Sequence, residues 1–297
     1  MGLIRLERIG KTRKNIIARP WHAAIQFAGR LGRTRRLEAG LFVFEINTRM
    51  SEMPRSPILL IHGLIGSLRD LLPVFARQGI QAFAPDLLGY GTLQDTAPSL
   101  IHLDGQVAHL ACWLKENNIE RVNLLGHSVG GAVAMRFARA YPERVASVIS
   151  VEGNFTLSDA FWSAGVARMA PVEAEAMLRD FRGAPGAWLA RSGIDATPAN
   201  LEMAARLLAN QPASTLQATA CSVVDVTGAP SFLEGVQAVF GGAIPVHLVA
   251  GERSFSGWNV PAWALESAAS ITRLPGGHLM MVEDPEGFVS AMAGMQR

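Results

Sequence analysis

A serine at position 128 stands at the centre of the pentapeptide Gly126-His127-Ser128-Val129-Gly130. A serine hydroxyl is a weak nucleophile at neutral pH, so a catalytic serine needs a neighbouring base and an exposed position. The apolar run 122–125 precedes the pentapeptide, and a run with helical periodicity, 132–140, follows it. A tight turn between a strand and a helix would expose the hydroxyl, and glycines on either side leave room for the close backbone approach. The pattern therefore predicts Ser128 as a nucleophile.

Backbone N–H groups beside such a serine could stabilise the oxyanion that forms when a nucleophile attacks a carbonyl. The segment Leu60-Ile61-His62-Gly63-Leu64 ends another apolar run. A turn at this point supplies one donor, which we assign to the N–H of Leu64. The N–H of Val129, at the start of the predicted helix, is the second donor. The side chain of His62 is predicted to brace this loop and that of His127 to take part in packing, and neither is predicted to take part in the reaction.

A base must accept the proton of the serine hydroxyl, and His278 is the best placed of the seven histidines. It follows Leu274-Pro275-Gly276-Gly277, a glycine-rich loop after the last apolar run of the chain. A side chain in such a loop lies at the carboxyl end of a strand, from where it can reach the serine. His247 lies inside an apolar run and is predicted to pack within the sheet.

The elements that must position these residues are short apolar runs separated by stretches with helical periodicity. Runs that are apolar on both faces are typical of buried parallel strands, and their alternation with helices indicates an α/β protein whose mostly parallel sheet is covered on both sides. The predicted strands cover residues 41–46, 58–61, 82–86, 122–125, 145–151, 246–250 and 271–274. We predict a core of residues 37–153 and 239–297, interrupted by a helical cap over 154–238.

The predicted cap carries several signals for helix starts. Pro171 and Pro198 suit first helical turns, Thr197 suits the N-cap position before the second of them, and Ser231 with Glu234 has the spacing of a capping box. The aromatic and Met side chains of the segment either line an apolar substrate pocket or seat the helices on one another, and the second role is the commoner one. They are Phe155, Phe161, Trp162, Met169, Met177, Phe181 and Trp188.

Together these motifs resemble those of the α/β-hydrolase superfamily over residues 38–297. The residues that carry the resemblance are His62-Gly63, Pro85-Asp86 with Gly89 and Gly91, the segment 126–131, and Gly277-His278 followed by Glu283-Asp284-Pro285. The resemblance implies an α/β-hydrolase fold with a helical cap after the sixth strand, a Ser–His–acid triad, an oxyanion hole and no cofactor.

The acid of the triad departs from the common pattern of the superfamily. That pattern places an Asp after the seventh strand, in a context like Gly-Glu-Arg-Asp, whereas this chain has Gly251-Glu252-Arg253-Ser254. Some members of the superfamily carry the acid at the end of the sixth strand, where this chain has Glu152. The base needs an acceptor that fixes its tautomer and stabilises the imidazolium. We therefore predict Glu152 as the acid, with Glu252 as the alternative acid; a Glu152 that only caps the entrance of the helical segment stays open.

Serine with histidine predicts acyl transfer through an acyl-enzyme, and not the attack by a carboxylate that dehalogenases and epoxide hydrolases use. We expect a serine hydrolase that acts on an ester, a lactone or a related carbonyl compound, with an apolar small molecule as substrate. An acyltransferase and a C–C bond hydrolase use the same triad and remain alternatives. A non-catalytic binding protein is the alternative of another class, and the presence of both Ser128 and His278 argues against it.

The composition is that of a compact globular chain, with 49% hydrophobic and 18% charged residues among 297. This length allows one substantial core with an inserted subdomain. Neither a C-x-x-C pair nor an H-E-x-x-H motif occurs, so no metal site is predicted. The two cysteines, Cys112 and Cys221, are expected to be small buried hydrophobes. No apolar run reaches the roughly 18–20 residues that span a bilayer, and we expect a soluble, cytoplasmic protein.

Residues 1–36 form a basic extension that holds ten Lys and Arg residues against one acid. A block of this kind is attracted to anionic surfaces, and an apolar helix face with Trp21 and Ile25 would suit peripheral contact with a membrane. The alternative, which we favour, is an extension that packs its apolar face on its own domain. No nucleic-acid partner is expected, and the sequence predicts no particular oligomeric state.

Overall fold

The computed structural model describes residues 35–36, 42–43 and 55–297. Strand β1 (Arg35–Arg36) pairs antiparallel with β2 (Phe42–Val43). These strands belong to one unit, residues 1–54, and residues 55–297 form a second, compact unit. The other residues of the predicted strand 41–46, and the apolar helix face around Trp21, lie outside the described residues.

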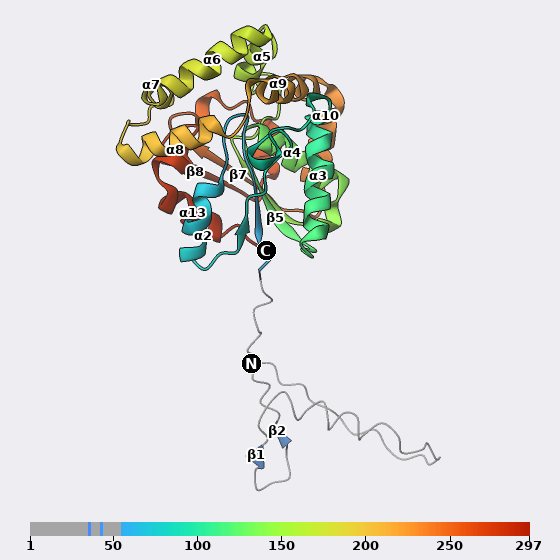
Figure 1. Ribbon diagram of the computed structural model, residues 1–297. Helices are drawn as coiled ribbons and strands as arrows, with labels where there is room; N and C mark the ends of the chain where they lie inside the picture. Colours follow the sequence, from blue (N-terminus) through green and yellow to red (C-terminus); the bar gives the residue numbers. More distant parts are fainter. Residues whose placement is uncertain (1–34, 37–41, 44–54) are drawn as a thin grey trace. The chain divides into compact units, whose positions relative to one another are not determined.

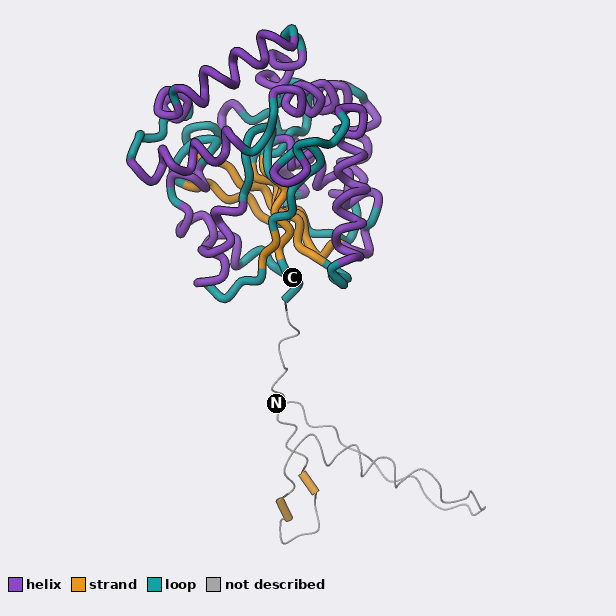
Figure 2. The backbone as a smooth tube through the Cα atoms, viewed as in Figure 1, coloured by secondary structure: helices purple, strands orange, loops and turns teal. Residues whose placement is uncertain are grey.

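The unit over residues 55–297 is built on a six-stranded sheet in which every neighbouring pair of strands is parallel (Figures 1 and 2). The order across the sheet is β4-β3-β5-β6-β7-β8. The strands are β3 (Ile58–Ile61), β4 (Ala82–Phe83), β5 (Val122–His127), β6 (Val145–Val151), β7 (Val246–Gly251) and β8 (Ser270–Leu274). Strands β3, β5, β6 and β7 are buried along their whole length, because helices cover both of their faces.

Helices pack on both faces of the sheet. Successive side chains of a strand point to opposite faces, so apolar strands present an apolar surface on each face. Leu59 and Ile61 of β3 join one apolar cluster, whereas Ile58 and Leu60 join the other. The first face is covered by α3 (Leu103–Glu116), α4 (Val129–Ala140), α10 (Pro230–Phe240) and α11 (Ala262–Ser267). The second is covered by α2 (Leu72–Arg77), α12 (Met280–Glu283) and α13 (Pro285–Ala293). The predicted α/β fold with a doubly covered parallel sheet is confirmed.

Helices α5 to α10 lie between β6 and β7 in the chain. They are α5 (Phe161–Ala167), α6 (Pro171–Gly183), α7 (Pro185–Arg191), α8 (Pro198–Ala209), α9 (Ala213–Gly228) and the helix α10 already given. Helices α5 to α9 pack on one another beyond the carboxyl ends of the strands, whereas α10 packs on α4 beside the sheet (Figure 1). The helical layer above the sheet edge is therefore formed by α5 to α9.

Helix starts within this segment follow local capping chemistry. Helices α6 and α8 begin at Pro171 and Pro198, and the Oγ1 atom of Thr197 accepts a hydrogen bond of 3.2 Å from the N–H of Asn200. A proline at the first helical position lacks only an N–H that would have had no partner, and its fixed φ suits a helix.

Two smaller sequence predictions are wrong. Helix α10 begins at Pro230, which leaves Ser231 inside the first turn with no side-chain cap to the backbone, so Ser231 and Glu234 form no capping box. Cys112 and Cys221 are exposed free thiols on α3 and α9 and are not buried. The first error arises because α10 begins before Ser231, and the second because composition does not specify which face of a helix meets a neighbour.

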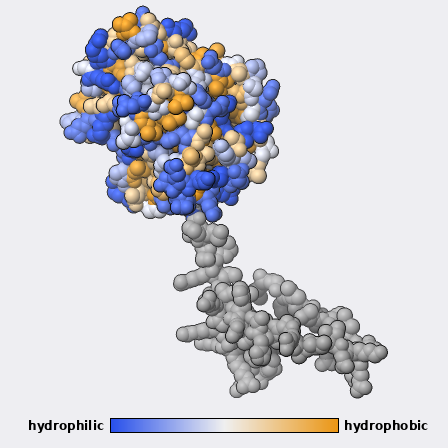
Figure 3. Space-filling model, turned by 45° about the vertical axis from the view of Figure 1, so that its right-hand side comes forward, coloured by the Kyte–Doolittle hydropathy of each residue, from blue (hydrophilic) through white to orange (hydrophobic). Residues whose placement is uncertain are grey.

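The aromatic and Met side chains of the segment 154–238 mostly seat its helices. Phe155 and Phe181 are buried, and Met169, Met177 and Trp188 are partly buried against the cores. Phe161 and Trp162 of α5 are exposed at 74% and 37%. Figure 3 shows hydrophobic residues among hydrophilic ones at the end of the unit where α5 and α6 lie. No helix in the described part of the chain is long and apolar enough to span a bilayer.

Candidate active site

Ser128 occupies a strained turn between β5 and α4. Its backbone angles, φ 54° and ψ −121°, lie in a region that residues with a side chain rarely adopt. Close backbone packing explains the neighbouring glycines: a Cβ on Gly126 would lie 2.4 Å from the carbonyl oxygen of Gly130, and one on Gly130 would lie 2.2 Å from that of Ile61. The turn holds the partly exposed Ser128 at the carboxyl end of β5, immediately before the positive end of α4.

The loop after β3 lies against this serine. A Cβ on Gly63 would be only 3.1 Å from the Cβ of Ser128. The hydroxyl of Tyr90 donates a hydrogen bond of 2.9 Å to the carbonyl of Leu64, which fixes that peptide unit. Within residues 55–297, neither the N–H of Leu64 nor that of Val129 donates a hydrogen bond to a backbone or side-chain acceptor. Both predicted oxyanion donors are therefore available to a ligand.

Two residues of the helical segment hold the same loop, and nothing in the sequence had singled them out. The buried Gln211 accepts a hydrogen bond of 2.9 Å from the N–H of Gly66 at its Oε1 atom. The side-chain amide of Asn210 donates to the carbonyl of Gly66 at 2.8 Å. The segment between β6 and β7 thus fixes the loop that carries Leu64.

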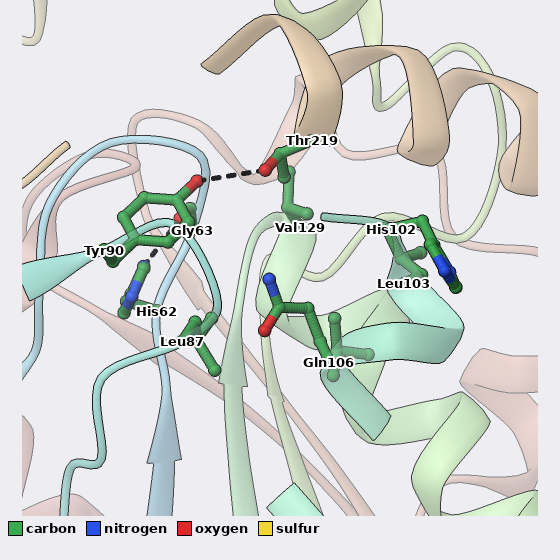
Figure 4. Close-up of a pocket in the computed structure, with 10 residues that line it drawn as sticks. His62, Gly63, Leu87, Tyr90, His102, Leu103, Gln106, Val129 and Thr219 are labelled. Carbon is green, nitrogen blue, oxygen red and sulfur yellow. Dashed lines mark hydrogen bonds between the residues drawn. The ribbon is translucent and has the colours of Figure 1, made fainter. Parts of the chain in front are cut away.

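A small cavity lies between this loop and α4 (Figure 4). Its volume is about 10 Å³, near the least that one water molecule needs. Gly63 and Val129 line it together with apolar side chains such as that of Leu87. The hydroxyls of Tyr90 and Thr219, which share a hydrogen bond of 3.3 Å, also border it. This cavity beside Gly63 and Val129 is therefore small and largely apolar.

The structure brings His278 and Glu152 together. Glu152 directly follows β6 and has a positive φ of 41°. The Nδ1 atom of His278 donates to the Oε2 atom of Glu152 at 2.6 Å. With the proton held at Nδ1, Nε2 is the nitrogen that can accept the hydroxyl proton of Ser128. Among the described residues no hydrogen bond yet joins Ser128 to His278; such bonds often form only when substrate is bound.

The second carboxylate oxygen of Glu152 also has partners. Its Oε1 atom accepts hydrogen bonds from the hydroxyl of Ser254 and, at 2.8 Å, from the N–H of Gly251. Burial alone would raise the pKa of the Glu152 carboxyl, but the hydrogen bond and charge of His278, followed by the bonds from Ser254 and Gly251, outweigh burial and hold the pKa below its usual value. Glu152 therefore stays ionised at neutral and mildly acidic pH.

The other candidates lie away from this pair. Glu252 is exposed, and within residues 55–297 its carboxylate makes no hydrogen bond or ion pair, while its backbone N–H donates to the carbonyl of Leu274 at 2.8 Å. His247 is buried in β7, where its Nδ1 atom shares a hydrogen bond of 2.8 Å with the hydroxyl of Ser270. The geometry accordingly favours Glu152 as the partner of His278.

The loop that carries His278 is anchored at two points. The Nε2 atom of His127 donates to the backbone carbonyl of His278 at 3.0 Å. Glu283 accepts the N–H of Gly277 at 2.8 Å and pairs with Arg253 at 2.8 Å. The side chain of His127 thus holds the loop that carries His278. Among the described residues, no cluster of His, Cys, Asp and Glu side chains is arranged to hold a metal ion.

Because two histidines are buried, we expect the free energy of unfolding to depend on pH. Burial lowers the pKa of His62 to about 4 and that of His127 to about 3, from a usual value of 6.5. Below pH 6.5 the unfolded chain therefore binds protons that the folded chain excludes, and the free energy of unfolding falls as the pH is lowered. Each histidine accounts for a loss of about 2 kcal/mol between pH 7 and pH 5.

The variant His127→Gln tests this expectation. Glutamine keeps a donor near the carbonyl of His278 but does not titrate, so the loss of stability between pH 7 and pH 5 should shrink by about 2 kcal/mol. Urea unfolding at the two pH values measures the loss. His102→Asn, at an exposed N-cap position, is the matched control. An equal loss in the wild type and in His127→Gln would contradict a neutral, buried His127.

Comparison with known proteins agrees with the fold and the motifs. Residues 56–193 match the family model described as alpha/beta hydrolase fold. A hydrolase from Pseudomonas aeruginosa has a TM-score of 0.61 at 22% identity over 80% of this chain and 89% of its own, and an esterase from Exiguobacterium antarcticum has a TM-score of 0.59 at 16% identity over 81% and 91%. The chain therefore shares the fold of these hydrolases, and residues 56–193 match the family model of that fold.

Curated relatives match over a shorter stretch. The chain is 34% identical over 115 residues to a 2-hydroxy-6-oxo-2,4-heptadienoate hydrolase of Pseudomonas putida, which is 35% of this chain and 41% of that protein. It is 34% identical over 113 residues to Lipase 1 of Psychrobacter immobilis, which is 37% of this chain and 34% of that protein. The matched part thus spans about two fifths or less of these relatives.

Proposed function

We propose that this protein is a serine hydrolase that cleaves an ester or a related carbonyl compound through an acyl-enzyme. The observation that carries the proposal is the arrangement around Ser128: a strained turn at the end of β5, two unoccupied backbone donors, and a His278 imidazole bonded to a buried carboxylate at 2.6 Å. Each part meets one requirement of acyl transfer by an alcohol, namely exposure, oxyanion stabilisation and a base of defined tautomer.

The proposed reaction proceeds in two halves. Nε2 of His278 takes the proton of the Ser128 hydroxyl while Oγ attacks the carbonyl carbon, and the oxyanion is bound by the N–H groups of Leu64 and Val129. The tetrahedral intermediate collapses as His278 protonates the leaving alcohol, which leaves an acyl-Ser128. Water then attacks the acyl group, again with His278 as base, and releases the acid. Glu152 stabilises the imidazolium in both halves and stays ionised.

We propose that the substrate is an apolar small molecule. Apolar side chains such as that of Leu87 border the small cavity beside Gly63 and Val129. The helical segment 154–238, which we propose acts as a cap, places Thr219 at the same cavity. Pockets discriminate between substrates by the methylene groups that they can enclose.

The substrate class can be tested with p-nitrophenyl esters of increasing chain length. We expect kcat/KM to change by about tenfold or more across the series, because a pocket discriminates between acyl chains by the methylene groups that it can enclose. A control series at submicellar concentrations excludes an effect of substrate aggregation. A kcat/KM that is equal for all chain lengths would contradict a pocket that encloses the acyl chain.

Covalent labelling tests the proposal itself. A fluorophosphonate should modify Ser128 alone, as detected by mass spectrometry of the peptide that contains it, since the probe needs an activated serine hydroxyl. The absence of labelling together with the absence of hydrolysis would favour a binding protein with this fold. Addition of an alcohol acceptor, followed by detection of a transferred acyl group, would distinguish an acyltransferase from a hydrolase.

A C–C bond hydrolase is the second candidate. It is supported by two relatives, the hydrolase of Pseudomonas putida described above and a 2-hydroxymuconate semialdehyde hydrolase of a Pseudomonas species that is 31% identical over 99 residues. The same serine, histidine and acid would serve, with a carbon leaving group in place of an alcohol. Hydrolysis of a vinylogous 1,5-diketone faster than of any ester tested would favour this candidate.

A further inference from the structure

Ser254 stands at the position where the resemblance to the superfamily leads one to expect the acid of the triad. Its hydroxyl donates to the Oε1 atom of Glu152, and the N–H of Gly251 donates to the same oxygen at 2.8 Å. The other oxygen, Oε2, meets Nδ1 of His278. The two carboxylate oxygens are therefore divided between two tasks: one binds donors of the β7 loop and the other binds the base.

This division restricts how the carboxylate can move. The side chain of Glu152 ends in a torsion that is broad and roughly two-fold, so the chain alone does not set the plane of the carboxylate. Two donors at Oε1 fix that plane and direct Oε2 at the imidazole. Glu152 is 6% exposed, and water therefore has little access to replace a lost donor.

The same geometry excludes a second carboxylate at position 254. A side chain there lies within hydrogen-bond distance of Oε1 of Glu152. Two carboxylates this close, one of them buried, strongly disfavour each other's ionisation, and one tends to take up a proton. A serine, which donates a proton and carries no charge, suits the place that a carboxylate leaves when the acid moves to the end of β6.

We propose that Ser254 is a positioning residue that orients Glu152 for His278 by donating a hydrogen bond to the oxygen that His278 does not use. Only the expected change in kcat rests on the proposed function; the orientation of Glu152 does not. The hydrogen bond between Glu152 and His278 can be observed in a protein that turns over no substrate, so the two ideas fail separately.

The test compares four variants. Ser254→Ala removes the donor, Ser254→Thr keeps it, and Ser254→Asp adds a second carboxylate. Ser256→Ala is the matched control, because Ser256 lies in the same loop, is exposed and makes no side-chain hydrogen bond within the described residues. Thermal unfolding of each variant verifies that the fold is retained.

Two measurements are made on each variant. The first is the downfield proton resonance of His278 Nδ1–H, assigned by its loss in His278→Ala and followed as a function of pH. The second is the pair of constants kcat and KM on p-nitrophenyl acetate. We expect Ser254→Ala to lower kcat about five- to twentyfold with KM changed less than twofold, and to shift the Nδ1–H resonance upfield and broaden it.

The remaining variants give opposite expectations. Ser254→Thr should keep the resonance and kcat within about twofold of the wild type, and Ser254→Asp should lower kcat by about fiftyfold or more. The proposal is overturned if Ser254→Ala matches Ser256→Ala in both the resonance and kcat, or if Ser254→Asp is as active as the wild type. If no ester is hydrolysed but the resonance responds as described, the orientation of Glu152 stands and the proposed reaction does not.

Discussion

Replacement of Ser128 by alanine is expected to lower kcat by on the order of 10³-fold or more while the free energy of unfolding changes little. Acyl transfer through Ser128 has no substitute nucleophile once the hydroxyl is lost, and the oxyanion donors alone provide only a residual acceleration. The hydroxyl of Ser128 makes no side-chain hydrogen bond in the described part of the chain, and alanine meets the same backbone strain at φ 54° as serine does. Stability should therefore be insensitive to the change.

The measurement combines ester hydrolysis with urea unfolding and fluorophosphonate labelling. Ser158→Ala is the matched control, because Ser158 is exposed on the segment before α5 and lies outside the proposed machinery. The control should label and turn over like the wild type. Activity that survives in pure Ser128→Ala, or labelling of that variant at another serine, would remove Ser128 from the proposed role.

The second large effect is expected at the acid. Glu152→Gln should lower kcat by roughly 10²–10⁴-fold with little change in KM, because an amide can present its NH₂ group to Nδ1 of His278 and so favour the wrong tautomer, and because the imidazolium then lacks its counter-charge. The carboxylate that is lost lies 2.6 Å from Nδ1 and is buried, so solvent does not replace it. Glu252→Gln, on the surface, should cost less than about tenfold.

Comparison of these two single variants decides which carboxylate acts. Kinetics at saturating and at limiting ester concentration separate kcat from kcat/KM for both. A large loss of kcat in Glu252→Gln, together with a nearly normal kcat in Glu152→Gln, would show that the acid lies after β7. The double variant Glu152→Gln with Ser254→Asp adds a further comparison: partial recovery relative to Glu152→Gln is expected if the β7 loop can present a carboxylate to His278, since geometry and not chain order defines a triad.

The parts of the site that depend on local chemistry could be predicted from the sequence. A buried parallel strand needs a continuous apolar run, and the tight turn after β5 needs glycines where the backbone of Gly130 approaches within 2.4 Å of a Cβ position. The starts of α6 and α8 could also be predicted, because a proline at the first helical position is a local signal. Predictions that needed knowledge of a packed face, such as the burial of Cys112, were wrong.

The sequence by itself determined the strand order along the chain, the turn that carries Ser128 and the loop that carries His278, because each depends on residues that are near neighbours in the chain. Only the tertiary structure decided which groups meet. Glu152 and His278 are 126 residues apart, and Glu152 and Ser254 are 102 apart. They come together because β6, β7 and β8 are adjacent and parallel, so that their carboxyl ends share one edge of the sheet. A hydrogen bond requires positions correct to a few tenths of an ångström, and that precision comes from packing of the whole sheet and not from any segment of it.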